Sequence, residues 1–210
     1  MRRSFVASLV ALFFLAGCNN TKKPSNANFT KAINQYLAKP DDACSSLGQT
    51  LPVNVTVPEQ KDQYGIGPEL AALEEAGLVR STNTTAAVHG MLDALRGSTP
   101  PQPVKRYELT DQGKKYYRQI PATFGQNGLF CYGRETVDSI IKWTEPGTME
   151  GATLSEVTYT YKIANLAPWA KQPDVQQAFP DLRQTLNEAS KANQTAELQL
   201  TNKGWQVPQP

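Results

Sequence analysis

The first 18 residues constrain the chain more than any other segment. Arg2 and Arg3 give a positive start, an almost unbroken apolar run follows from Phe5 to Ala16, and Cys18 comes two residues later. A charged start, an apolar core and small residues before a cleavage site are typical of a secretory signal. The run is too short to cross a bilayer as a helix, which takes about 20 apolar residues. The sequence therefore predicts that residues 1–17 are a signal peptide.

The end of this segment, Leu15-Ala16-Gly17-Cys18, resembles the lipobox of bacterial lipoproteins. The resemblance implies that the chain is cut before Cys18 and that this cysteine carries fatty acids of the palmitate kind. Several acyl chains would then anchor the protein firmly to a membrane. Asn19 follows where an aspartate would resemble an inner-membrane retention signal, so the implied address is the outer membrane of a bacterial cell envelope. The alternative is an ordinary secretory signal in which the cysteine falls by chance.

Charge argues against a polyanionic partner. Removing residues 1–17 from the 210 leaves 193 residues, and it also removes Arg2 and Arg3 from the 21 basic residues. The remaining 19 basic residues equal the 19 acidic ones, so the mature chain is close to neutral. A neutral chain lacks the basic surface that nucleic acids attract. We therefore expect no nucleic-acid partner.

The other two cysteines, Cys44 and Cys131, form an even pair in a chain expected to be exported. In an oxidising compartment such a pair predicts a disulfide bond. The alternatives are two free thiols or a metal pair, but the chain contains a single histidine, His89, and no Cys-x-x-Cys motif.

Periodicity divides the mature chain into a tether and two halves. Residues 18–27 are polar and are expected to form a flexible lipidated tether. Residues 28–120 are expected to be helix-rich, with helices at 29–37, 67–77 and 110–120. Residues 121–210 are expected to combine an antiparallel sheet with a helix interrupted at Pro180. The best strand is Val157 to Ile163, where apolar and polar residues alternate.

Two motifs of the first half resemble the winged-helix transcription regulators. They are Leu70-x-x-Leu-Glu-Glu-Ala-Gly-Leu-Val79 and Tyr107-Glu-Leu-Thr-Asp-Gln-Gly113. The resemblance covers residues 29–119 and implies a helix, a hairpin wing and a further helix. The helix that would enter a DNA groove carries Glu69, Glu74 and Glu75 and lacks Lys and Arg up to Gly77. Phosphates would repel these carboxylates, so the resemblance extends to architecture alone.

Catalytic motifs are scarce. The chain has no Gly-x-Ser-x-Gly elbow, His-Glu-x-x-His motif or phosphate loop. Any serine-histidine-carboxylate site would need His89, which most simply is a solvated surface residue. Trp169 and Trp205 fall outside the alternating strands, where they could either close the core or form an exposed contact surface.

These observations predict an α+β protein in which a helix-rich, winged-helix-like N-terminal half is packed with a C-terminal half of mixed antiparallel sheet and helix. The expected function is that of a non-catalytic, lipid-anchored binding or scaffold protein. Its expected partners are the membrane, through Cys18, and another envelope protein or the cell wall, with no cofactor and no metal. The alternatives are an envelope hydrolase that uses His89 and a carrier of a small apolar ligand.

Overall fold

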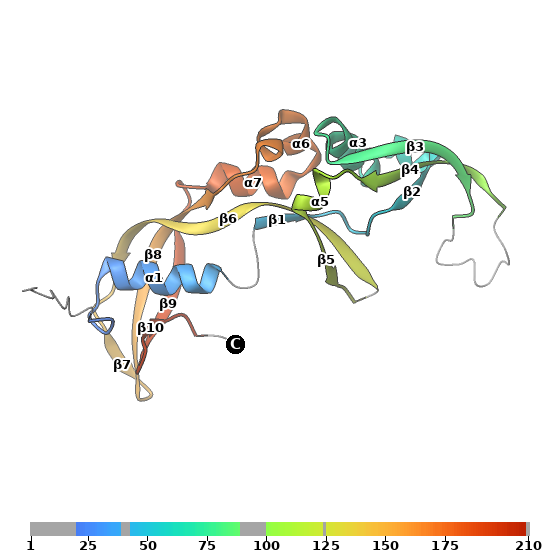
Figure 1. Ribbon diagram of the computed structural model, residues 1–210. Helices are drawn as coiled ribbons and strands as arrows, with labels where there is room; N and C mark the ends of the chain where they lie inside the picture. The colour runs from blue at the N-terminus through green and yellow to red at the C-terminus, as the bar shows by residue number, and fades with distance from the viewer. Residues whose placement is uncertain (1–19, 39–42, 89–99, 124, 209–210) are drawn as a thin grey trace, which may run out of the picture.

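The computed structural model describes residues 20–38, 43–88, 100–123 and 125–208. Strands account for 43% of the described residues and helices for 29%. Figure 1 shows an elongated molecule with a large curled sheet toward one end and a small sheet toward the other. Cys18 and His89 lie outside the described residues.

The larger sheet is antiparallel, and its described strands are β1 (Ala43–Ser46), β5 (Tyr117–Pro121), β6 (Gln126–Trp143), β7 (Gly147–Met149), β8 (Ala152–Ala164), β9 (Gln194–Thr201) and β10 (Gly204–Gln206). Its order is β1-β6-β8-β9-β10, with β5 paired to β6 and β7 paired to β8. The alternation in β8 places Val157, Tyr159 and Tyr161 in one hydrophobic cluster, as the sequence predicts.

Helix α1 (Asn26–Leu37) covers this sheet and contacts β6 and β10. Its periodicity buries Phe29 and Ile33, and the Phe29 ring lies between the two indoles of Trp143 and Trp205 at 5.3 and 5.1 Å. The predicted helix is confirmed. It packs, however, on β6, β9 and β10, which are distant in sequence, and not on the small sheet, whose first strand is much nearer in sequence.

The smaller sheet has the order β2-β4-β3, formed by β2 (Val53–Thr56), β3 (Val79–Ala86) and β4 (Gln102–Leu109). Helices α2 (Val57–Lys61) and α3 (Ile66–Glu75) lie beside it. Gly77 ends α3 in the left-handed region, at φ +74°, as its position after the helix predicts. Leu70, Leu73 and Leu78 are fully buried here and join the small sheet to the first strands of the large one.

Between the two sheets lie η1 (Pro168–Lys171), α6 (Pro173–Ala178) and α7 (Pro180–Glu188). Pro180 begins a new helix, which confirms the predicted interruption. Trp169 is only 2% exposed and its ring meets Tyr116, Phe130 and Tyr132 edge-on at 6.1 to 6.3 Å. Trp205 is 5% exposed. Both indoles therefore close the core, and neither forms the exposed contact surface that was the other possibility.

The expectation of a helix-rich, winged-helix-like N-terminal half is wrong. The chain is dominated by strands, and the helix expected at 110–120 is a single turn, α5 (Gly113–Tyr116), followed at once by β5. Tyr117 starts β5, packs its ring on Phe130 and accepts a hydrogen bond from the Leu51 N–H at 2.9 Å. Pairing with β6 overrides the local helical pattern because it buries this ring and satisfies the backbone of both strands.

The predicted disulfide is present and joins Cys44 in β1 to Cys131 in β6. The two residues are direct cross-strand partners. They are 87 residues apart in sequence, and closing a loop of that length stabilises a fold by about 4 to 5 kcal/mol on the chain-entropy account. The bond fixes β1 to β6. Residues of β6 belong to two hydrophobic clusters, one around the helices between the sheets and one under α1.

The turn that replaces the expected helix depends on Gly113. A β-carbon there would overlap the carbonyl oxygen of Leu78, which accepts a hydrogen bond from the Thr110 N–H at 3.0 Å.

We expect Gly113→Ala to lower the free energy of unfolding by about 2 kcal/mol or more, because the turn must move away from Leu78. Urea denaturation measures this. Gly147→Ala, where a β-carbon meets no atom within 4 Å, is the control and should change stability by less than about 0.5 kcal/mol. Equal stabilities for the two variants would contradict this account.

Candidate binding groove

A groove of about 740 Å³ lies between α3 on one side and α6 with the first residue of α7 on the other. A second hollow of about 520 Å³ adjoins it on the side of β1 and shares Tyr64, Gly65 and Glu69 with it. We call the first hollow the α3–α6 groove. Its lining residues are Gln63, Tyr64, Gly65, Pro68, Glu69, Ala71, Ala72, Glu75, Asp174, Gln177, Ala178 and Pro180.

Helical spacing explains why these side chains reach the groove. On α3, Leu70 and Leu73 turn into the core, which leaves Pro68, Ala71 and Glu75 on another face. On α6, Val175 is buried, and Asp174, Gln177 and Ala178 share an adjacent face at i, i+3 and i+4. Two amphipathic helices thus bury their apolar sides in a common core and present polar sides across the groove.

Tyr64 stands at the mouth of both hollows. Its side chain is 98% exposed, while its backbone N–H donates to the Asp62 carboxylate Oδ1 at 3.0 Å. The loop is therefore held at its backbone and displays an aromatic ring to solvent. Tyrosine is enriched among residues that carry the energy of protein interfaces, because it offers a large rigid surface with a polar tip.

The groove is acidic. Glu69, Glu75 and Asp174 line it, and the described residues of its lining include no lysine or arginine. Burial, and to a smaller extent the nearby Asp181 carboxylate, together raise the pKa of Glu69 to about 7. A cationic ligand that paired with Glu69 would favour its charged form and so would bind with the release of a proton near neutral pH.

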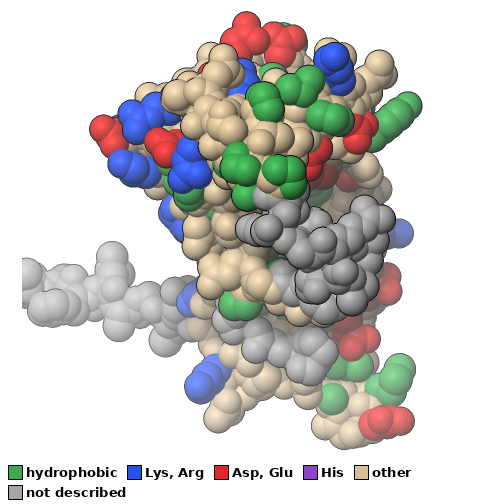
Figure 2. Space-filling view, turned by 90° about the vertical axis from the view of Figure 1, so that its right-hand side faces the viewer, with side chains coloured by type: hydrophobic (Ala, Val, Ile, Leu, Met, Phe, Trp, Pro, Cys, Tyr) green, Lys and Arg blue, Asp and Glu red, His purple; other side chains and the backbone are tan. Residues whose placement is uncertain are grey.

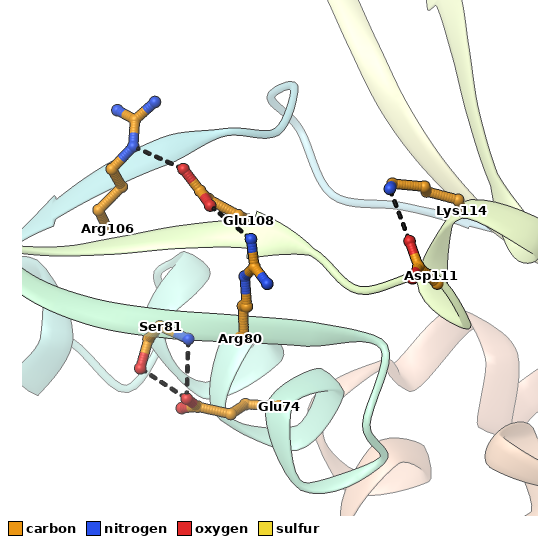
Figure 3. A network of polar contacts seen from close by, with 7 residues as sticks. All are labelled: Glu74, Arg80, Ser81, Arg106, Glu108, Asp111 and Lys114. Atoms are coloured by element: carbon orange, nitrogen blue, oxygen red, sulfur yellow. Dashed lines mark hydrogen bonds and ion pairs between the residues drawn. The ribbon is translucent and has the colours of Figure 1, made fainter.

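Glu74, on the same helix, has a structural role. It forms an ion pair with Lys105 at 2.9 Å and accepts hydrogen bonds from Ser81, as Figure 3 shows for the Ser81 contacts. Burial would raise the pKa of Glu74, but the bonds from Lys105 and Ser81 outweigh it and hold the pKa below its usual range. Of the three carboxylates that set this helix apart from a DNA-reading helix, Glu69 and Glu75 face the groove and Glu74 ties α3 to the small sheet.

The residues singled out by sequence do not meet in this groove. Cys44 and Cys131 lie in the sheet, and Trp169 and Trp205 are buried. Cys18, the expected lipid site, and His89, which only the alternative hydrolase would use, lie outside the described residues. Sequence reasoning missed Tyr64 and Asp174. The only signal in the sequence was Tyr64, an aromatic residue in the polar run between Pro58 and Gly65. That signal is too weak to predict a site, because the other side of the groove comes from α6, more than 100 residues later.

The sequence matches no protein-family model and no curated protein, and no solved structure matches the chain. Among the described residues, no helix combines the length and apolar character needed to cross a membrane. The same part of the chain contains no group of three or more histidine, cysteine or acidic side chains placed to hold a metal ion.

The raised pKa of Glu69 makes stability depend on pH. The folded protein keeps this proton up to a pH of about 7, whereas the unfolded chain releases it near 4.5. The folded state therefore binds more protons between these values, and stability falls as pH rises through them.

We expect Glu69→Gln to remove about 2 kcal/mol of this loss of stability between pH 5 and pH 8, a value discounted for partial exposure. Urea denaturation at the two pH values measures it. Glu197→Gln, at an exposed carboxylate of β9, is the control, and an unchanged pH dependence in Glu69→Gln would contradict the assignment.

Proposed function

We propose that this protein is a lipid-anchored component of a bacterial cell envelope that binds another envelope protein without catalysing a reaction. The observation that carries the proposal is the sequence Leu15-Ala16-Gly17-Cys18 directly after a charged start and an apolar run. Acylation of Cys18 would hold the folded body at a membrane surface, and Asn19 favours the outer membrane. A disulfide between Cys44 and Cys131 is in keeping with an oxidising compartment.

The α3–α6 groove supports the binding part of the proposal. It combines an exposed aromatic ring, small residues that leave room for a partner and three carboxylates. Opposite charge across an interface gives specificity and speeds association. The complementary partner carries lysine or arginine side chains, which a protein segment supplies more readily than the sugar chains of the cell wall.

The anchor is tested by the Cys18→Ser variant. We expect fatty acid supplied to growing cells to label the natural protein and to leave Cys18→Ser unlabelled, because only a thiol at this position matches the lipobox resemblance. Gel analysis of labelled cells provides the measurement. Asn20→Ser is the matched control, since it introduces the same residue two positions later and keeps the thiol. Fatty-acid label on Cys18→Ser would refute the anchor.

The groove is tested by a photo-crosslinking amino acid placed at Tyr64. We expect one protein to be captured in intact cells from this position and not from Ile141, which is 53% exposed on β6. Identification by mass spectrometry should show a lysine- or arginine-rich segment at the crosslink. Its capture should disappear when Glu69→Lys and Asp174→Lys reverse the charge of the groove.

The matched control for this experiment is the pair Glu156→Lys and Glu197→Lys. These exposed carboxylates face each other across β8 and β9, so the pair changes net charge equally at a distant place. Capture that survives the groove reversal, or that fails equally in both double variants, would count against the groove as the contact.

A further inference from the structure

The segment that enters α1 is bonded to the body of the protein. The Asn28 side-chain amide donates to the backbone carbonyls of Asn20 and Lys23, at 2.9 and 2.8 Å. The Lys23 N–H also donates to the Asn20 carbonyl at 3.1 Å. Sequence reasoning expected a flexible tether over residues 18–27, but its described part forms a hydrogen-bonded turn that begins at Asn20.

This turn is also fixed to the far end of the chain. The Trp205 indole N–H donates to the Lys22 carbonyl at 3.1 Å, and its ring packs on Phe29. Thr21 lies directly over Gly204, where an added β-carbon would come within 2.9 Å of the Thr21 carbonyl oxygen. The start of the described chain, α1 and the β9–β10 turn therefore form one packed end of the molecule.

Only Asn19 separates Cys18 from this packed end. A residue of extended chain spans at most about 3.6 Å, so an acyl anchor on Cys18 would be joined to Asn20 by a link of at most about 7 Å. An acyl anchor on Cys18 would hold the Asn20 end near the bilayer but would still allow the body to tilt about it. The charge of the surface around Asn20 then decides whether this end rests on the lipid headgroups.

The charge of this end suits an anionic bilayer. Residues 20–38 and 198–208 contain four lysines and no aspartate or glutamate. The β7–β8 turn, which lies beside the β9–β10 turn, adds the exposed carboxylate of Glu150, so positive charge remains in excess here. The lysines are Lys22, Lys23, Lys31 and Lys203, and all four are exposed. Lys31 and Lys203 also border a hollow of about 170 Å³ whose other polar side chains come from Thr21, Asn28, Gln35 and Gln206. Lysines beside a bilayer are attracted to anionic lipids, and the attraction falls off within a Debye length.

We propose that this lysine end, formed by Asn20–Lys23, Lys31 and the β9–β10 turn, docks on anionic phospholipid headgroups and fixes the orientation of the protein on the membrane. The inference rests on the proposed acylation of Cys18. In Figure 1 the lysine end, with α1 and β10, lies far from α3 and α6. Docking in this orientation directs the α3–α6 groove away from the bilayer, toward partners in the space beyond.

The opposite end carries charge of both signs. Figure 2 views the molecule from the side of the small sheet and shows Lys and Arg side chains intermixed with Asp and Glu. Ion pairs account for part of this mixture, since Glu108 binds both Arg80 and Arg106, at 3.3 and 3.1 Å (Figure 3). Carboxylates at this end pair with part of its positive charge, so the lysine end, whose lysines lack such partners among the ion pairs described, is the better docking face.

The test places the acylated full-length protein in vesicles of anionic and zwitterionic phospholipid that carry a headgroup quencher. A fluorophore is attached through Asn202→Cys in the β9–β10 turn or through Asn83→Cys in β3, both exposed asparagines. The natural disulfide and the acylated Cys18 leave the new thiol as the labelling site. We expect several-fold stronger quenching at position 202 than at position 83 on anionic vesicles. The ratio should fall toward one at about 1 M salt, where the Debye length is about 3 Å.

Charge reversal supplies the matched comparison. The triple variant Lys22→Glu, Lys23→Glu and Lys203→Glu should lose the quenching difference on anionic vesicles. The exposed lysines Lys61, Lys115 and Lys171 lie elsewhere, and reversing them changes net charge equally but should preserve the difference. Equal quenching at the two positions in acylated protein would overturn the docking surface and leave the anchor intact. Mass spectrometry that finds no acyl group on Cys18 would overturn both.

Discussion

The structure depends on one strand, β6, that takes part in both hydrophobic clusters. Phe130 and Tyr132, in its first part, pack with the helices between the sheets, whereas Val137, farther along, packs under α1. β1 and β5 pair with the first part and β8 pairs with the second. The disulfide at Cys131 fixes β1 to the same strand. Because both clusters share this backbone, loss of its pairing would expose apolar side chains at both ends of the molecule.

Local patterns predicted the elements whose stability is largely local or whose periodicity is clear. The i, i+3, i+4 spacing around Phe29 gave α1, Gly77 gave the end of α3, and alternation from Val157 gave β8. The helix predicted after Gly113 was wrong because this segment pairs as a strand with β6, which begins at Gln126. Secondary structure follows tertiary pairing where a strand partner and a buried ring, here Tyr117 on Phe130, outweigh weak propensity.

The groove and the lysine end could not be predicted, because each joins segments that are distant in sequence. Glu69 and Asp174 face one groove only after α6 has folded against α3, and no local pattern records that contact. Likewise, Lys22 and Lys203 come together because the Trp205 indole holds the Lys22 carbonyl. The sequence did supply the chemistry at each place: a helix rich in carboxylates, and an N-terminal segment free of them.

The balance of basic and acidic side chains in residues 18–210 conceals a separation of charge in space. Equal numbers of basic and acidic residues in 18–210 suggest a protein indifferent to electrostatics. Residues 20–38 and 198–208 of the lysine end nevertheless contain no carboxylate, and the described lining of the groove contains no lysine or arginine. Fields from separated patches act locally, because salt screens them within about 8 Å at physiological ionic strength. Each patch would therefore attract an oppositely charged surface independently of the other patch. A protein with this arrangement can be held by a negative surface at one end and recognise a positive one at the other, without any excess charge overall.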